Sequence, residues 1–209
     1  MSYLRDPAEI YRESFAAIAR EVDLSRFPES LHKIVLRLVH AIAMPEIVDD
    51  IAWDGDVAGA ARASLANGAP IIVDANMVVA GIMQDRLPKG TEVKCSLRDD
   101  SVPELALSLA TTRSAAAVEL WRPYLDGAII SIGNAPTALF HLIDMLEDPE
   151  CPRPAAIFGF PVGFIGAAES KAYLIEKDLG IPYITLKGRK GGSALAAAAV
   201  NAVVLEGVS

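Results

Sequence analysis

The sequence predicts an α/β fold, a three-layer α/β/α domain with a mostly parallel central sheet of about five strands. Short apolar segments alternate with helical segments through the last two thirds of the chain. Three of these apolar segments lead through glycine-rich turns into helices. Hydrophobic residues make up 52% of the chain but aromatic residues only 6%, so we expect helices that pack closely through alanine.

The length of 209 residues fits one domain, because most domains have about 100–200 residues. We predict a single domain over residues 1–209, with a helical N-terminal part (1–68) and an alternating α/β part (69–209). The first part has apolar residues at helical spacing, and Asp6 followed by Pro7 is typical of a helix start. The helices predicted here are residues 6–23, 28–44 and Asp56–Asn67.

The second part contains short, mostly apolar segments that are typical of buried parallel strands. The predicted strands are Pro70–Asp74, Glu92–Leu97, Ala128–Ile132, Ala155–Gly159 and Pro182–Leu186. The helices predicted between and after them are Pro103–Trp121, Ala135–Glu147, Gly166–Asp178 and Ser193–Leu205. Folds of this kind bind ligands at the carboxyl ends of the strands, so we expect the site there.

The three glycine-rich turns lie within "SIGNAPTALF", "GFPVGFIGAAES" and "KGRKGGSALAAAA". A helix N-terminus offers free N–H groups to anions, and glycine allows close approach to the backbone. The spacing matches neither a dinucleotide-binding GxGxxG nor a P-loop. Each turn alone is explained as well by tight strand-to-helix packing. Three on one edge favour a shared site for a large ligand.

Few side chains offer chemistry near these turns. Arg113 begins a segment of small residues and is suited to clamp a carboxylate, although a surface or bridging role is equally plausible from sequence. Arg189 lies beside Gly191 and fits an anion site or a solvated loop. His40 ends an apolar helical stretch, where we expect it to be half-buried. Taken alone it fits a core histidine, or a general acid or base that titrates near neutral pH.

Composition disfavours several classes of function. Acidic residues outnumber basic ones by 27 to 19, which argues against a nucleic-acid binder. The two cysteines form no CxxC motif and no Cys/His cluster, so we predict no metal site and reduced thiols. The longest apolar run, Ala155 to Ala168, has 14 residues, whereas a membrane span needs about 20. With no signal peptide recognised, we expect a cytoplasmic protein without membrane contact.

Several segments together resemble the precorrin-8X methylmutase family of cobalamin biosynthesis. They are "RLVHA", "TTRSAAAVELW", "IGNAPTALF", "FGFPVGFIGAAESK" and "GRKGGSALAAAAVNA". The combination of "GNAPTAL" with "PVGFIGAAESK" is specific. The likeness extends over nearly the whole chain, from "IYRESFAAI" to "GGSALAAAAVNA".

The resemblance implies an isomerase that moves a methyl group from C11 to C12 of a corrinoid macrocycle, giving hydrogenobyrinic acid or its cobalt equivalent. Such a rearrangement needs no cofactor. In the family, the histidine of the "VHA" segment is the proton donor and acceptor at the ring, which here is His40. The implied substrate-binding residues are Ser14, Thr112, Arg113, Asn134, Thr137, Gly163, Phe164 and Arg189. The resemblance further implies a homodimer and transfer of the product to the next enzyme of the pathway.

Two other functions remain open at this level. One is a corrinoid carrier that binds the macrocycle without changing it. The other sets the resemblance aside and treats the chain as an α/β enzyme acting on a phosphorylated metabolite, with the phosphate at a glycine turn.

Overall fold

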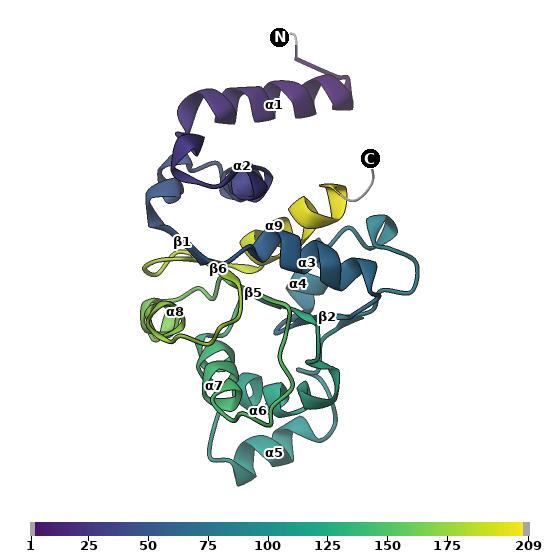
Figure 1. The fold of residues 1–209 in the computed structure, drawn as a ribbon, viewed down its shortest axis with the longest axis vertical. Coiled ribbons are helices and arrows are strands. Elements are labelled where there is room, and N and C mark those ends of the chain that lie inside the picture. Colours follow the sequence, from purple (N-terminus) through teal and green to yellow (C-terminus); the bar gives the residue numbers. More distant parts are fainter. Residues whose placement is uncertain (1–2, 207–209) are drawn as a thin grey trace.

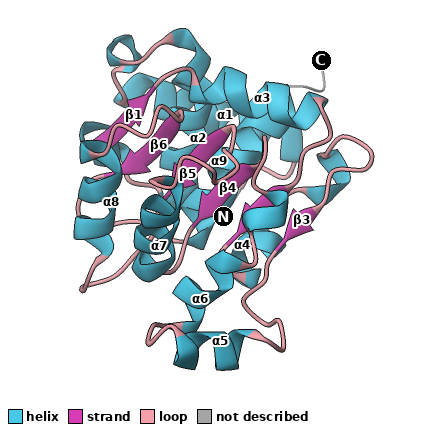
Figure 2. Ribbon diagram, turned by 60° about the horizontal axis from the view of Figure 1, so that its bottom comes forward, coloured by secondary structure: helices cyan, strands magenta, loops and turns pink. Residues whose placement is uncertain are grey.

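The computed structural model describes residues 3–206, so the predicted domain 1–209 extends outside the described residues at both ends. The fold is the predicted α/β class, built on a six-stranded sheet rather than one of about five strands. The strand order is β1-β6-β5-β4-β2-β3, and every pair is parallel except β1 with β6 (Figure 2). The strands are β1 (Ile51–Asp54), β2 (Ile71–Val73), β3 (Val93–Lys94), β4 (Ile129–Ile132), β5 (Ala156–Gly159) and β6 (Tyr183–Leu186).

The extra strand lies in the part of the chain that was predicted to be wholly helical. β1 pairs antiparallel with β6, with Ile51 opposite Leu186. Unlike the predicted strands β2, β4, β5 and β6, which are buried throughout, β1 is buried only at Ile51 and ends at the exposed Asp54, so it forms no continuous apolar segment that the sequence would reveal. At the other edge β3 covers two residues, much less than the predicted strand Glu92–Leu97.

Helices cover both faces of the sheet, and Figure 1 shows the layers one above the other. One face is covered by α2 (His32–Ile42), α3 (Val57–Ala66), α4 (Asn76–Gly81) and α9 (Ser193–Glu206). The other is covered by α6 (Arg113–Glu119), α7 (Pro136–Leu146) and α8 (Ala167–Glu176). Two helices lie outside these layers: α1 (Pro7–Glu21) packs on α2, and α5 (Val102–Ser108) packs on α6.

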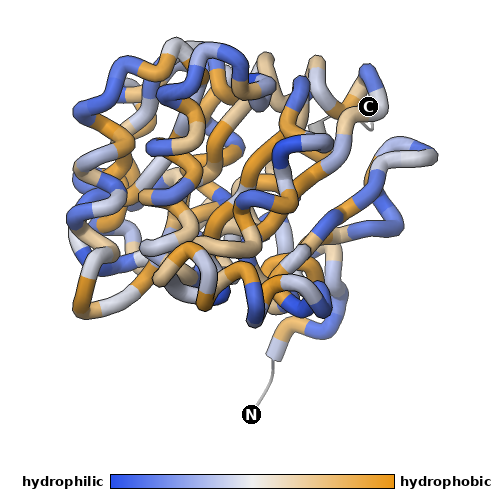
Figure 3. The backbone as a smooth tube through the Cα atoms, turned by 90° about the horizontal axis from the view of Figure 1, so that it is seen from below, coloured by the Kyte–Doolittle hydropathy of each residue, from blue (hydrophilic) through white to orange (hydrophobic). Residues whose placement is uncertain are grey.

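Alternation along the strands divides the core between the two faces. Ile71 and Val73 of β2 belong to the core under α9, whereas Ile72 belongs to the core under α7. The apolar segments lie in the interior of the tube view, and most hydrophilic ones follow the outer bends (Figure 3). At Gly133 a Cβ atom would lie 2.7 Å from the Ser193 Cα, so α9 packs directly against the turn that follows β4.

The predicted helix Pro103–Trp121 is wrong, because two short helices, α5 and α6, occupy this stretch. Ala110 between them has a φ of 49°, in the left-handed region that breaks a helix. Thr112 then caps α6, since its Oγ1 accepts a hydrogen bond of 3.2 Å from the Ala115 N–H. Within residues 3–206, no helix is long and apolar enough to span a membrane.

Candidate functional site

The three glycine-rich turns meet at one edge of the sheet, as predicted. They follow β4, β5 and β6, which are adjacent and parallel. Backbone hydrogen bonds join the first turn to the second, with the Val162 N–H donating to the Asn134 carbonyl at 3.5 Å. The second joins the third through the Gly163 N–H and the Arg189 carbonyl at 3.3 Å. The turns therefore form one continuous backbone surface.

Glycine is required where these turns cross. A Cβ atom at Gly191 would lie 2.3 Å from the carbonyl oxygen of Pro161, so no larger residue fits between the second and third turns. Gly166 has a φ of 80° as it enters α8, a conformation that favours glycine. Part of the glycine content is thus explained by packing, as the sequence alone allowed.

The turn after β4 is organised by Asp74, which sequence analysis did not single out. Its carboxylate lies at the end of β2, is 3% exposed, and accepts hydrogen bonds from the N–H groups of Gly133, Asn134 and Ala135 at 2.7–2.9 Å. Burial raises the pKa of Asp74 above its usual range, and the three N–H groups oppose that rise. These N–H groups are therefore already bonded to a carboxyl group of the protein itself.

The start of α6 lies against the start of α7. Thr112 and Thr137 share a hydrogen bond of 2.8 Å between their hydroxyl oxygens. Arg113, the first residue of α6, is exposed beside them. Further along the two helices, His141 Nε2 lies 2.6 Å from Glu119 Oε1, which holds α6 against α7. Three of the predicted site residues are thus brought together on a fixed pair of helices.

The turn after β5 presents large apolar side chains to solvent. Phe164 is 87% exposed and Ile165 is 90% exposed. The guanidinium carbon of Arg189 lies 5.3 Å from the centroid of the Phe164 ring, within the range of a cation–π contact. The α8 N-terminus behind them, at Gly166, has no side-chain cap. Exposed apolar groups beside a cation and an uncapped helix start are suited to a ligand that is apolar with anionic groups.

The predicted catalytic residue is paired with a second predicted residue. Ser14 Oγ of α1 lies 3.0 Å from His40 Nδ1 at the end of α2. The Phe15 ring stacks on the imidazole, with 4.9 Å between ring centroids. The expectation that His40 is half-buried was wrong, because the His40 side chain is exposed. α2 turns Val35, Leu38 and Val39 into the core, and His40 follows on the solvent side.

The structure therefore gathers the predicted residues into three groups. These are Ser14 with His40, Thr112 and Arg113 with Thr137, and Gly163 and Phe164 with Arg189, while Asn134 joins the first two turns. Sequence analysis did not single out Phe15 or Asp74. A usable signal existed for Asp74, since an acidic residue at the end of an apolar strand points to the carboxyl edge of the sheet.

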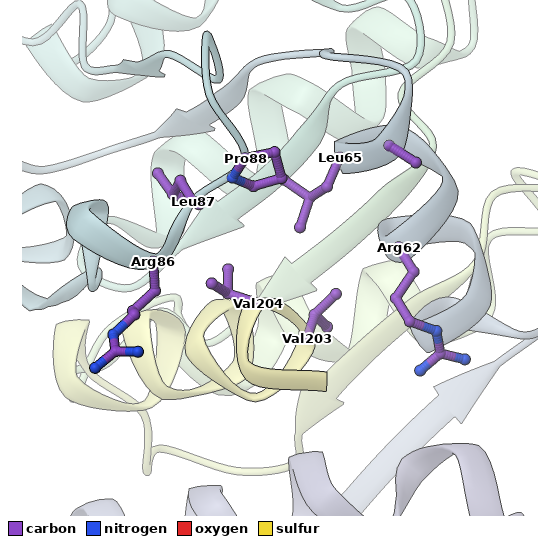
Figure 4. Close-up of a pocket in the computed structure, with 8 residues that line it drawn as sticks. Arg62, Leu65, Arg86, Leu87, Pro88, Val203 and Val204 are labelled. Atoms are coloured by element: carbon purple, nitrogen blue, oxygen red, sulfur yellow. The ribbon is translucent and has the colours of Figure 1, made fainter. Parts of the chain in front are cut away.

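A pocket of about 470 Å³ lies away from these groups (Figure 4). Its floor is apolar, and Arg62 and Arg86 lie on opposite sides of it. It is formed near the C-terminal end of α9, at Val203 and Val204, whereas the glycine turns lie at the start of that helix. None of the residues predicted for the site lines this pocket.

Comparisons with known proteins agree on one family. The family model described as precorrin-8X methylmutase matches residues 9–206. A precorrin-8X methylmutase of Pseudomonas aeruginosa is 50% identical over 99% of this chain and 99% of its own length. A cobalt-precorrin-8 methylmutase of Priestia megaterium is 37% identical, over 94% of this chain and 87% of its own. The crystal structure of precorrin-8X methylmutase from Thermus thermophilus matches with a TM-score of 0.85 and 35% identity, over 95% of each chain.

Proposed function

The chain belongs to the precorrin-8X methylmutase family of isomerases, and we propose that it moves a methyl group from C11 to C12 of a corrinoid macrocycle with His40 as its acid and base. The observation that carries the role of His40 is its pairing with Ser14. An exposed histidine, oriented by a hydroxyl on one side and a stacked ring on the other, has one nitrogen left for a ligand.

The Ser14–His40 hydrogen bond supports Nε2 as the nitrogen that transfers the proton. Ser14 engages Nδ1, so Nε2 is the nitrogen available to the macrocycle. Protonated His40 donates the Nε2 proton to the ring, which draws electron density toward the protonated position and eases methyl migration. The proton then returns to Nε2, and the product is an isomer of the substrate. No nucleophile is consumed, and Phe15 keeps the imidazole plane fixed through stacking.

The glycine turns supply the binding surface. A corrinoid is a broad apolar ring with carboxylates around its rim, and Phe164 is exposed to meet the ring. Arg113 and Arg189 are exposed to meet carboxylates. The start of α8 is partly buried at Gly166 and has no side-chain cap, so it adds a partial positive charge to the same surface. Thr112, Thr137, Asn134 and Gly163 contribute hydroxyl groups and backbone to the same surface.

The turn after β4 argues against the phosphorylated-metabolite alternative. Its N–H groups would be the natural phosphate cradle, but Asp74 already accepts hydrogen bonds from three of them. A second anion at this position would face the Asp74 carboxylate. The turn is therefore better explained as a rigid support for Asn134 and Thr137 than as a phosphate site.

We further propose that the substrate is the metal-free macrocycle. Relatives named for precorrin-8X are 50% identical, whereas a relative named for the cobalt compound is 37% identical.

A homodimer is proposed by analogy with the family, and Ile10 and Tyr11 of α1, both nearly half exposed, offer apolar surface for it. Transfer of the product to the next enzyme would follow from tight product binding.

The test is a visible-absorbance titration of hydrogenobyrinic acid, followed by turnover of precorrin-8X, with wild type and His40→Ala. We expect a saturable spectral shift in wild type that is altered in the variant, and turnover slowed about 100- to 10,000-fold. His32→Ala, at the start of the same helix, is the matched control and should keep wild-type turnover.

The outcomes separate the alternatives. Binding without turnover in the wild type would favour the carrier, and full turnover in His40→Ala would overturn the assigned role of His40. If hydrogenobyrinic acid leaves the spectrum of the wild type unchanged, the corrinoid site is wrong.

A further inference from the structure

A lysine is buried beneath the glycine turns. Lys171 of α8 is 0% exposed, and its Nζ donates a hydrogen bond to the backbone carbonyl of Lys190 in the turn after β6. The side chain thus spans from the helix after the second turn to the backbone of the third. Its role is not part of the chemistry derived above, because it is enclosed by protein and faces no solvent.

The turn that Lys171 reaches carries a proposed substrate-binding residue. Arg189 precedes Lys190, and its carbonyl accepts the hydrogen bond from Gly163 while its guanidinium lies over Phe164. Fixing the Lys190 carbonyl fixes the peptide plane between Lys190 and Gly191, which is the next plane along the chain from the one that carries the Arg189 carbonyl. If the Lys190 carbonyl were free to rotate, the backbone on the C-terminal side of Arg189 would lose this anchor.

The same turn is held from the other side by Asp50, the last residue before β1. The Lys187 N–H donates to the Asp50 carbonyl at 2.8 Å. Lys190 Nζ lies 3.7 Å from the Asp50 carboxylate. The third turn is thus clamped between a buried ammonium group below it and the segment that leads from α2 into β1.

We infer that Lys171 is a positioning residue for the corrinoid, which holds the turn after β6 so that Arg189 and Phe164 together receive the macrocycle. The inference rests on the proposed function. Lys171 does not touch the substrate and acts through the carbonyl of Lys190.

The energetics agree with a positioning role. Burial lowers the pKa of Lys171 from 10.5 to about 8, and the charge of Asp50 opposes this only in part. A buried ammonium is unfavourable compared with an apolar side chain of similar length. An apolar residue would fill the same space, but it would leave the carbonyl of Lys190 without this donor.

The test compares Lys171→Met with Lys177→Met, the same substitution at the half-buried residue that caps the C-terminal end of α8. Lys177 pairs with Glu147 at the surface and lies outside the site. We expect Lys171→Met to raise the dissociation constant for hydrogenobyrinic acid and the KM for precorrin-8X about tenfold. kcat should stay within about twofold, because His40 is untouched. Lys177→Met should bind and turn over as wild type.

A double-mutant cycle with Arg189→Ala separates positioning from general weakening. If Lys171 acts through Arg189, the double variant should bind about as weakly as Arg189→Ala alone. The inference would be overturned if the two substitutions raised the dissociation constant independently, so that their fold-changes multiplied in the double variant. It would also be overturned if Lys171→Met folded and bound hydrogenobyrinic acid as tightly as wild type. If Lys171→Met does not fold, Lys171→Leu, which also removes the donor to the Lys190 carbonyl, serves in the same cycle.

Hydrogen exchange of the Gly163 and Gly192 amides provides a readout that does not depend on corrinoid binding. These amides bond to the Arg189 and Phe160 carbonyls, and both should exchange faster in Lys171→Met than in Lys177→Met. If wild type fails to bind hydrogenobyrinic acid, the proposed function fails. Unchanged exchange would then overturn the positioning role as well, whereas faster exchange would support it.

Discussion

The turn after β4 and the Ser14–His40 pair are held in place in opposite ways. The turn is held by a buried residue, because the carboxyl group of Asp74 accepts hydrogen bonds from three of its N–H groups. The Ser14–His40 pair is held at the surface, because Ser14 lies on α1, a helix with no buried residue, and His40 is exposed. One region depends on a buried carboxyl group. The other depends on polar and ring contacts between α1 and α2, namely the Ser14–His40 hydrogen bond, the Phe15–His40 stack and the hydrogen bond from Arg37 to Tyr11.

This difference matches the tasks proposed for the two regions. A surface that receives a rigid, flat ring gains from being preorganised, since little ordering is left for the moment of binding. A group that gives and takes a proton must reach the ring and therefore cannot be enclosed by the core. Substitutions in the first region should act mainly on stability, and those in the second mainly on turnover.

Asp74→Ala should produce the largest effect on stability. It removes the acceptor for three N–H groups, two of them on buried residues, and we expect the free energy of unfolding to fall by about 3 kcal/mol. Asp74→Asn keeps one acceptor oxygen and should lose about half as much. Urea unfolding curves measure both changes. Asp178→Ala, at an exposed position, is the control and should change stability by less than about 0.5 kcal/mol. If Asp74→Ala were as stable as that control, the turn would not depend on its internal anion.

Much of this organisation could be predicted from sequence. The three turns stood out because glycine follows a short apolar segment in each, and adjacent parallel strands bring such turns to one edge. Ser14 and His40, 26 residues apart, were predicted through family resemblance, and the structure places them in hydrogen-bond contact. No periodic pattern could have paired them, because their contact depends on how α1 packs across α2.

The missed features have physical causes. β1 is an edge strand of four residues whose partner lies far along the chain, so only tertiary pairing reveals it. The break between α5 and α6 occurs at Ala110, a strong helix former held in a left-handed conformation by its surroundings. Lys171 was missed because a lysine in a helical pattern is normally solvated, and its burial depends on the turn that folds over it.

The buried ammonium beneath the turns should make stability depend on pH. The pKa of Lys171 is about 8 in the folded protein and near 10.5 when solvated. Between these values the unfolded chain binds a proton that the folded chain has released. Folding therefore carries the full cost of the buried charge below pH 8, and this cost is relieved as the pH rises toward 10.5. Between pH 7.5 and 9.5, wild type should gain about 2 kcal/mol relative to Lys171→Met.

Urea unfolding of wild type and Lys171→Met at pH 7.5, 8.5 and 9.5 measures this difference. Titration of other groups, such as Tyr183, affects both proteins equally and cancels in the comparison. A constant difference across the three pH values would mean that Lys171 keeps its ordinary pKa. In that case the region beneath the glycine turns would hold no destabilising buried charge.

Ser14→Ala should have the smallest effect, and it addresses the weakly held region directly. Losing the hydroxyl removes the partner of His40 Nδ1, so the imidazole is held by Phe15 alone. We expect turnover of precorrin-8X to fall about three- to tenfold, which corresponds to about 1 kcal/mol. Stability should stay within about 0.5 kcal/mol of wild type, because α1 contributes no buried residue.

Two further variants make the Ser14→Ala result specific. Ser14→Thr keeps the hydroxyl and should restore most of the turnover, whereas Ser108→Ala removes an exposed hydroxyl elsewhere and should leave it unchanged. If Ser14→Ala instead lowered stability by as much as Asp74→Ala, the two regions would not differ in how they are held. A selective loss of turnover, recovered by threonine, would mean that one surface hydrogen bond orients the histidine, whereas the turn after β4 is held by a buried carboxyl group.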